Sequence, residues 1–299
     1  MTMTIYAITH HTRYTYSSAV VLGHNEAHLL PRDNIDWQRC GESRIEISPR
    51  PTLTIERRDF FGNRLLYFAI QDIHHCLDVS VKTEVETRGQ SFSESSSSPP
   101  WETVVQQLRS DPDPEVIETR QFILNSPFIS HDQALQDYAV PSFPAGRPLW
   151  EAVLDLTQRI YRDFTYDPHF TTVATPLHEV LAERRGVCQD FAHLAIGCLR
   201  SLGLAARYMS GYLETIPPPG QPCLIGADAS HAWLAVYLPH VGWAEFDPTN
   251  NCMPREQHII LAWGRDYSDV APLKGVMSGG GEHTLVVSVD VAPQERDGN

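Results

Sequence analysis

The chain contains 299 residues, of which 42% are hydrophobic and 20% charged, and its formal net charge at pH 7 is −14. This composition is typical of a folded globular protein and argues against disorder over most of the chain. The negative charge would repel a phosphate backbone, so nucleic acid is not an expected partner.

The sequence also indicates where the protein works. No stretch approaches the roughly 18 uninterrupted apolar residues of a membrane span, and the N-terminal MTMTIYAITHHTRYTYSS lacks the pattern of a secretory signal. Six cysteines, at positions 40, 76, 188, 198, 223 and 252, form no CxxC pair. This spacing suits neither a disulfide scaffold nor a zinc site. We therefore expect a cytoplasmic protein with free thiols, no membrane contact, and no metal or other cofactor.

The first domain is predicted to be all β. In HHCLDVSVKTEVETR (74–88), apolar and polar residues alternate, which is the period of a half-buried strand. Residues 4–16 and 44–70 give similar signals. The pattern predicts an antiparallel β-sandwich over residues 1–92.

A serine-rich segment, SFSESSSSPP (91–100), contains too few apolar side chains to be buried and is predicted to be a linker. The second domain would then span residues 101–299. Helical spacing comes first, with helices predicted after Asp113, after Ser130, within 147–164 and after Thr175. Strand patterns then return at 205–213, 231–238, 241–247 and 284–293.

A cysteine begins one helix of this second domain, within RRGVCQDFAHLAIGCL (184–199). From Phe191 onward, apolar residues recur at offsets of 3, 4, 7, 8 and 11, which trace one face of a helix. Cys188 precedes Phe191 by three residues and therefore lies in the first turn. Unpaired N–H groups and the helix dipole there favour a thiolate and can bind an oxyanion. Cys198 is expected to be a core residue, and a structural role is the alternative for Cys188.

A thiolate nucleophile needs a base, and the base needs an orienting group. His231 begins an alternating strand, with its imidazole on the face opposite Ala232 and Leu234, and Asp247 ends the next strand. A hairpin around Pro239 could pair His231 directly with Asp247. That register requires a loop with an odd number of residues, three or five. A loop of four would place the two side chains on opposite faces.

Other polar and aromatic residues near these positions have two interpretations. Gln189 and Asp190 either stabilise the helix N-terminus or line the site. Trp233 either forms a wall of a groove or packs in the core. The adjacent histidines at 10–11 and 74–75 would point to opposite faces of their strands, so neither pair is predicted to bind metal.

GVCQDFAHLAIGCLRSLGLAARYMSGY (186–212) and SHAWLAVYLPHVGWAEFDPTNN (230–251) resemble the bacterial branch of the transglutaminase-like superfamily. FTYDPHFTTVATPLHEVL (164–181) and the all-β N-terminal region are similar to the same group, so the resemblance covers essentially the whole chain. It implies an α+β protein, in which a papain-like core of helices packed on an antiparallel sheet follows the β-sandwich. The cysteine would lie on a helix and its two partners on the sheet.

The resemblance also implies roles for these residues. Cys188 would be the nucleophile, His231 the general base and Asp247 the group that orients the imidazole. The backbone N–H of Cys188 would be one oxyanion donor, and Tyr166 is the candidate for the second. Attack on an amide carbon would give a thioester that water or an amine resolves, so the implied activity is that of an amide-bond hydrolase or acyltransferase on peptide or protein substrates.

The sequence departs from the animal members of this superfamily that cross-link proteins. Those have a tryptophan directly after the cysteine, where this chain has Gln189, and no calcium-binding loop is present. Hydrolysis is therefore expected at least as much as transamidation. The alternative is an inactive binding or scaffold module whose site is covered by another segment, such as SGGGEH (278–283). Substrate contacts would come from the loop at 214–230.

Overall fold

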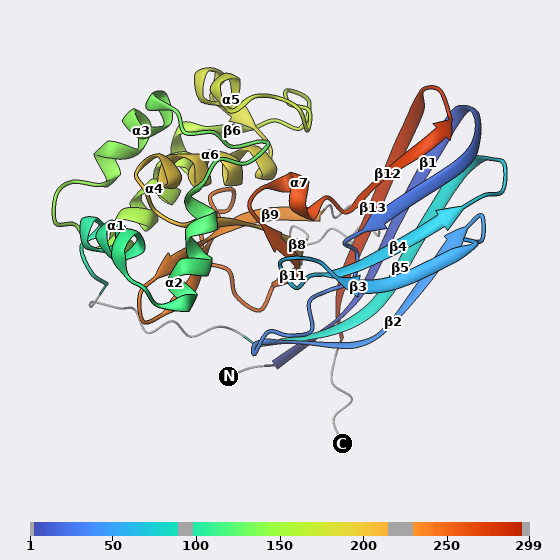
Figure 1. Ribbon diagram of the computed structural model, residues 1–299, viewed down its shortest axis with the longest axis horizontal. Coiled ribbons are helices and arrows are strands. Elements are labelled where there is room, and N and C mark those ends of the chain that lie inside the picture. Colours follow the sequence, from blue (N-terminus) through green and yellow to red (C-terminus); the bar gives the residue numbers. More distant parts are fainter. Residues whose placement is uncertain (1–2, 89–97, 215–229, 295–299) are drawn as a thin grey trace, which may run out of the picture.

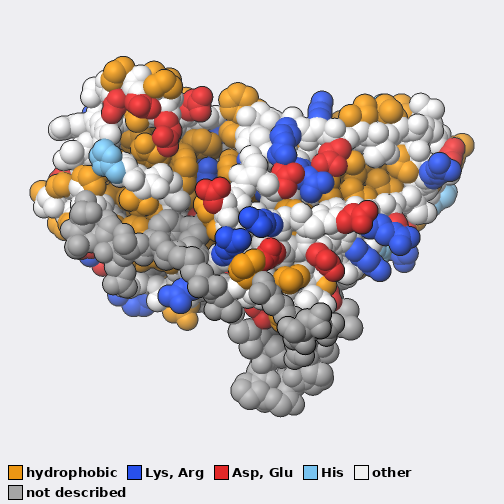
Figure 2. All heavy atoms as spheres, turned by 90° about the horizontal axis from the view of Figure 1, so that it is seen from below, with side chains coloured by type: hydrophobic (Ala, Val, Ile, Leu, Met, Phe, Trp, Pro, Cys, Tyr) orange, Lys and Arg blue, Asp and Glu red, His pale blue; other side chains and the backbone are white. Residues whose placement is uncertain are grey.

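The computed structural model describes residues 3–88, 98–214 and 230–294. A large, strongly twisted sheet forms one end of the molecule, and a group of helices with a smaller sheet forms the other (Figure 1). The first seven residues of the predicted linker at 91–100, and the predicted substrate loop at 214–230 apart from its two end residues, lie outside the described residues. Acidic and basic side chains are interspersed over the face seen in Figure 2.

Seven antiparallel strands form the large sheet in the order β2-β5-β1-β4-β3, with β12 and β13 also paired to β1. Their bounds are β1 Met3–Ala27, β2 Gln38–Ser48, β3 Leu53–Arg58, β4 Arg64–Ile70, β5 His74–Arg88, β12 Leu273–Gly279 and β13 His283–Gln294. The long strand β1 organises the sheet, since its first half pairs with β5 and β13 and its last part with β4 and β12. Buried residues of β4 and β5 share one hydrophobic cluster.

The antiparallel β fold of the N-terminal region is confirmed, but the C-terminal strand lies elsewhere than expected. We predicted that it belongs with the second domain, whereas β13 pairs with β1 from Ile5 to Tyr16. Val289 and Val291 of β13 are buried in the same cluster as Ile8 of β1. The strand joins this sheet because its apolar face completes that core and covers an otherwise open edge of β1.

The second part combines helices with a four-stranded antiparallel sheet of order β10-β9-β8-β11. The strands are β8 Ala206–Leu213, β9 Ser230–Leu238, β10 Gly242–Phe246 and β11 His258–Gly264, and the short β6 Thr165–Tyr166 pairs in parallel with β7 Arg185–Gly186. The helices are α1 Trp101–Ser110, α2 Pro114–Thr119, α3 Gln133–Ala139, α4 Leu149–Asp163, α5 Leu177–Glu183, α6 Cys188–Ser201 and α7 Tyr267–Val270, with 3₁₀ turns η1 Arg120–Ile123 and η2 Val140–Ser142. The α+β architecture is as predicted.

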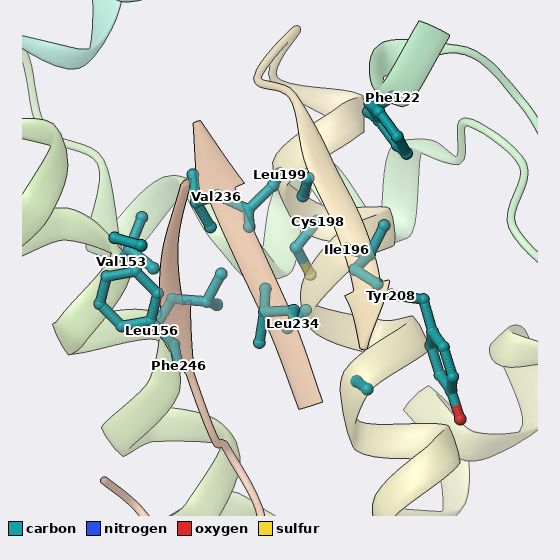
Figure 3. Packing of buried hydrophobic residues seen from close by; sticks show 14 of the residues in the cluster. Phe122, Val153, Leu156, Ile196, Cys198, Leu199, Tyr208, Leu234, Val236 and Phe246 are labelled. Atoms are coloured by element: carbon teal, nitrogen blue, oxygen red, sulfur yellow. The ribbon is translucent and has the colours of Figure 1, made fainter. Parts of the chain in front are cut away.

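Helix α6 is the central helix of this part. Figure 3 shows Cys198 and Leu199 directed toward Leu234 and Val236 of β9. Cys198 is fully buried, as predicted, and burial raises the pKa of its thiol to about 12. Burial of this apolar face supplies the hydrophobic energy that fixes α6 on the sheet, at about 25 cal/mol per Å² of apolar surface.

The opposite face of the four-stranded sheet is turned toward the N-terminal region. Gln38 links the two parts, because its side chain donates to the carbonyl of Ile260 at 2.8 Å and accepts from the Ile260 N–H at 2.7 Å. Met209, Trp233 and Ile260 form a buried cluster on this face with Ile35. The predicted base and its orienting residue lie on this face as well.

Gly211 of β8 leaves space on that face for the side chains of neighbouring strands. A Cβ atom at Gly211 would lie 2.0 Å from the carbonyl oxygen of Ile259 and 2.5 Å from the ring of Trp233. We therefore expect Gly211→Ala to cost about 2–3 kcal/mol, lowering the melting temperature by at least about 5 °C in a thermal unfolding measurement. Gly23→Ala is the matched control, because the nearest atom to its Cβ would be 3.5 Å away. Equal losses in the two variants would contradict the steric explanation.

Candidate active site

The chain around Cys188 is fixed by one buried carboxylate. Val187 precedes α6 in an extended conformation, and Asp190 Oδ2 accepts hydrogen bonds from the Val187 N–H at 2.8 Å and from Thr171 Oγ1 at 2.7 Å. Gly186 allows this approach, since a Cβ there would lie 2.7 Å from Asp190 Oδ2. Asp190 thus stabilises the start of the helix, and Cys188 is its first residue.

The second polar residue of this turn makes a weaker contact. The Nε2 of Gln189 donates to the Val173 carbonyl at 3.4 Å, so its side chain reaches the segment before α5. Burial raises the pKa of Asp190, although the hydrogen bonds from Thr171 and Val187 act in the opposite direction. A contact of Gln189 or Asp190 with substrate remains a prediction.

The hairpin of β9 and β10 confirms the predicted loop parity but not the predicted pairing. Leu238 pairs with Gly242, so the loop contains three residues, at 239–241. The register continues to Leu234 opposite Phe246, which places the next residue, Asp247, two positions from direct opposition to His231. A shift of two preserves the face of every side chain. His231 and Asp247 are therefore diagonal neighbours, a separation that an imidazole and a carboxylate can bridge.

The imidazole and the carboxylate are in direct contact. His231 Nε2 lies 2.7 Å from Asp247 Oδ2, and Asp247 is wholly buried. Asn250 donates to the same oxygen from Nδ2 at 2.7 Å, while the N–H of Thr249 donates to Oδ1 at 2.9 Å. These bonds satisfy a carboxylate that would otherwise be costly to bury.

The electrostatics follow from this arrangement. Burial alone would lower the pKa of His231, but its hydrogen bond with Asp247, the neighbouring Cys188 and the negative charges of both raise it to about 10. Burial would raise the pKa of Asp247, but hydrogen bonds from His231 and His258 hold it below its usual range. Since Nε2 faces Asp247, Nδ1 is the nitrogen left for Cys188. The imidazole therefore lies between a thiol and a carboxylate.

The stability contributed by His231 should depend on pH. Its folded-state pKa is raised from 6.5 to about 10, so the stabilisation is complete below about pH 6.5 and is lost as pH rises toward 10. We expect the melting temperature of the wild type to exceed that of His231→Gln by several degrees at pH 6, and by clearly less at pH 10. Thermal unfolding of both proteins at constant ionic strength measures this. A difference that stays constant or grows with pH would contradict the charged pair.

The two aromatic residues predicted to line the site, Tyr166 and Trp233, differ in their exposure to solvent. Tyr166 is 54% exposed, packs edge-on against Phe191, and its backbone pairs with Gly186 next to the cysteine. Burial and then the negative charge of Cys188 raise the pKa of its hydroxyl. Trp233 is fully buried, stacks on the His231 ring and donates from Nε1 to a glutamate carboxylate at 2.7 Å. Of the two interpretations for Trp233, core packing is the one observed.

Two residues of the site were missed from the sequence. His258, at the start of β11, places its Nε2 atom 3.1 Å from Asp247 Oδ2, and Asn250 follows Asp247 in a turn. Neither carries a local sequence signal, although Asn250 belongs to the quoted FDPTNN stretch. The ligand atoms of His231, Asp247 and His258 lie within 4.8 Å of one another, close enough to hold a metal ion. The hydrogen bonds among them use those same atoms.

Comparison with known proteins places this site in a family. Residues 141–248 match the transglutaminase-like superfamily, and residues 6–86 match the bacterial transglutaminase-like N-terminal region. A protein of Mycobacterium tuberculosis strain H37Rv, named only as uncharacterized, is 42% identical over 98% of this chain and 94% of its own length. The chain belongs to the transglutaminase-like superfamily. Its matched core contains Cys188, His231 and Asp247.

Further comparisons extend over the whole transglutaminase-like chain. An uncharacterized protein of Mycobacterium leprae is 33% identical over 95% of this chain and 97% of its own length. A solved structure from Cytophaga hutchinsonii, described as a "putative cysteine protease", superimposes with a TM-score of 0.76 at 21% identity, covering 100% of this chain and 93% of that one. This likeness shows the fold. None of the described helices is long and apolar enough to cross a membrane.

Proposed function

We propose that this transglutaminase-like protein is a cysteine-dependent amide-bond hydrolase or acyltransferase that acts on peptide-like substrates. The observation that carries the proposal is the His231 imidazole, which is hydrogen-bonded to Asp247 at 2.7 Å and whose pKa is raised both by Asp247 and by the neighbouring Cys188. A nucleophile, a base and an orienting group within hydrogen-bond reach are the parts that covalent acyl transfer requires.

The reaction would proceed in two steps. The Cys188 thiolate attacks the amide carbon, and the carbonyl oxygen becomes an oxyanion near the first N–H groups of α6. The His231 imidazolium donates its Nδ1 proton to the leaving amine as the carbon–nitrogen bond breaks, which leaves a thioester on Cys188. Neutral His231 then takes a proton from water or from a second amine, whose attack on the thioester releases the acid or a new amide and restores the Cys188 thiolate beside the His231 imidazolium. Asp247 stays ionised and accepts the hydrogen bond from the Nε2–H of His231 throughout.

Tyr166 is our candidate for the second oxyanion donor. Three observations support a place for Tyr166 at the entrance of the site. Its ring is exposed, its backbone pairs with Gly186, and the charge of Cys188 adds to burial in raising the pKa of its hydroxyl. The partial exposure of Cys188 itself supports access for a peptide substrate. A reducing, cytoplasmic location is part of the proposal, and the free thiols of all five cysteines in the described segments support it.

An activated ester tests the proposal independently of substrate specificity. Wild type mixed with p-nitrophenyl acetate should release a burst of p-nitrophenolate equal to the enzyme concentration, with an acetyl group on Cys188 by mass spectrometry. Incubation of the enzyme with a library of peptides and amines would then distinguish hydrolysis from acyl transfer, because only transfer forms a new amide. Absence of the burst and of the acetyl adduct would overturn the proposal.

The alternative, an inactive module with a covered site, loses one of its supports. The SGGGEH segment (278–283) does not lie over Cys188, because Gly280 donates to the Ala19 carbonyl and Glu282 to Ser17 Oγ. These contacts place the segment beside β1 at the outer end of the large sheet (Figure 1). The strands on either side of this segment, β12 and β13, both pair with β1, which also keeps the segment beside β1.

A further inference from the structure

A second histidine reaches the carboxylate that orients His231. His258 Nε2 lies 3.1 Å from Asp247 Oδ2, the same oxygen that His231 contacts. Both partners are enclosed, since Asp247 is fully buried and His258 is 7% exposed. His258 belongs to β11 and Asp247 follows β10, so the contact joins the two opposite edges of the sheet.

The residue between these edges makes the contact possible. Gly211 of β8 pairs with His231 on one side and Ile260 on the other. Because it has no side chain, the Trp233 ring lies over it. The His258 ring packs edge-on against Trp233, with centroids 5.2 Å apart, and His231 stacks on the same indole at 5.9 Å. The two imidazoles thus contact the Asp247 carboxylate, and the indole against which both pack holds His258 in one orientation.

The hydrogen-bonding pattern assigns a direction to this contact. His258 Nδ1 is buried and has no hydrogen-bond partner among the described residues. A proton on Nδ1 would be a buried, unpaired donor, which is costly, whereas a lone pair there costs less. The proton therefore lies on Nε2, and His258 donates to Asp247.

We propose that His258 is a positioning residue, which fixes the Asp247 carboxylate in the orientation and charge state that receive the His231 Nε2–H. This inference rests on the proposed function. Among the described residues, the side chain of His258 forms its one hydrogen bond with Asp247, and its ring packs against those of Trp233 and His231. Outer partners of metal-ligating histidines change activity by about 10- to 100-fold when they are removed, and by analogy we expect an effect of this order for His258.

The test compares an apolar and a polar replacement. His258→Phe keeps a ring but removes the donor, whereas His258→Gln places an amide N–H near the position of Nε2. We expect His258→Phe to slow iodoacetamide labelling of Cys188 about 10-fold at pH 7, and His258→Gln to keep the rate within about threefold of wild type. In the Asp247→Ala background, His258→Phe should have no further effect, because the path through Asp247 is already lost.

His10→Phe is the matched control, since His10 is also a buried histidine, with hydrogen bonds to Tyr212 and Thr12. It should lower thermal stability without slowing the labelling of Cys188. If His258→Phe fails to fold, His258→Leu takes its place in the same comparison. Three results would overturn the inference. The first is equal slowing of Cys188 labelling in His258→Phe and His258→Gln, and the second is further slowing by His258→Phe in the Asp247→Ala background. The third is a labelling rate in His258→Phe that stays within twofold of the wild type. Wild-type Cys188 no more reactive than other partly exposed thiols would instead overturn the proposed function.

Discussion

Cys188→Ala should abolish the burst of p-nitrophenolate from p-nitrophenyl acetate, with the rate of amide or ester turnover falling at least about 10⁴-fold. The reason is that no other group at the start of α6 can form the acyl intermediate. Loss of a covalent nucleophile leaves only binding and oxyanion contacts, which give little rate on their own. The burst amplitude and the acetyl adduct in intact-mass spectra are the measurements.

Cys198→Ala is the matched control for this prediction. Cys198 lies on the same helix but is fully buried, so its removal should leave the burst unchanged while lowering stability by the cost of a small cavity. A burst that persists in Cys188→Ala, or that disappears equally in Cys198→Ala, would show that the reaction does not pass through the predicted thiol.

His231→Gln should reduce the same burst rate about 10³-fold and should slow alkylation of Cys188 at pH 7. The glutamine carries no charge, so it cannot stabilise a thiolate as the imidazolium does, and it cannot return a proton to the leaving amine. Stopped-flow measurement of the burst and timed labelling with iodoacetamide give the two rates. Asp247 and Cys188 themselves are unchanged in this variant.

His75→Gln provides the comparison for His231→Gln, because His75 is an exposed histidine on β5 of the large sheet. Its replacement should leave both rates within the error of the wild type. If His231→Gln behaved like His75→Gln, the imidazole would have no part in the chemistry, and the short contact with Asp247 would be structural only.

Local sequence patterns were sufficient for the start of α6 and for the face of His231. The apolar spacing after Phe191 follows from the 3.6-residue helical period, and it placed Cys188 in the first turn. Alternation in β9 placed His231 opposite the aliphatic residues that contact α6. Because the side-chain period of a strand is two, an odd loop was required, and the observed loop of three meets that requirement.

Features that depend on distant segments could not be derived in this way. The alternating valines of β13 predict a strand but not its partner, and β1 is almost the length of the chain away. His258 meets Asp247 only because Gly211 and the sheet order bring opposite edges together. The two-residue shift of the β9–β10 register is likewise invisible to the pattern, since it moves no side chain to the other face.

The relative reactivity of the thiols measures the central claim most directly. Cys252 is partly exposed, like Cys188, but burial raises the pKa of its thiol to about 11. In wild type treated with iodoacetamide at pH 7, peptide mass spectrometry should find Cys188 labelled at least about 100-fold faster than Cys252, because a thiolate reacts and a thiol does not. The difference should largely disappear in His231→Ala. Cys188 labelled no faster than Cys252 in the wild type would contradict a thiol activated by His231 and Asp247.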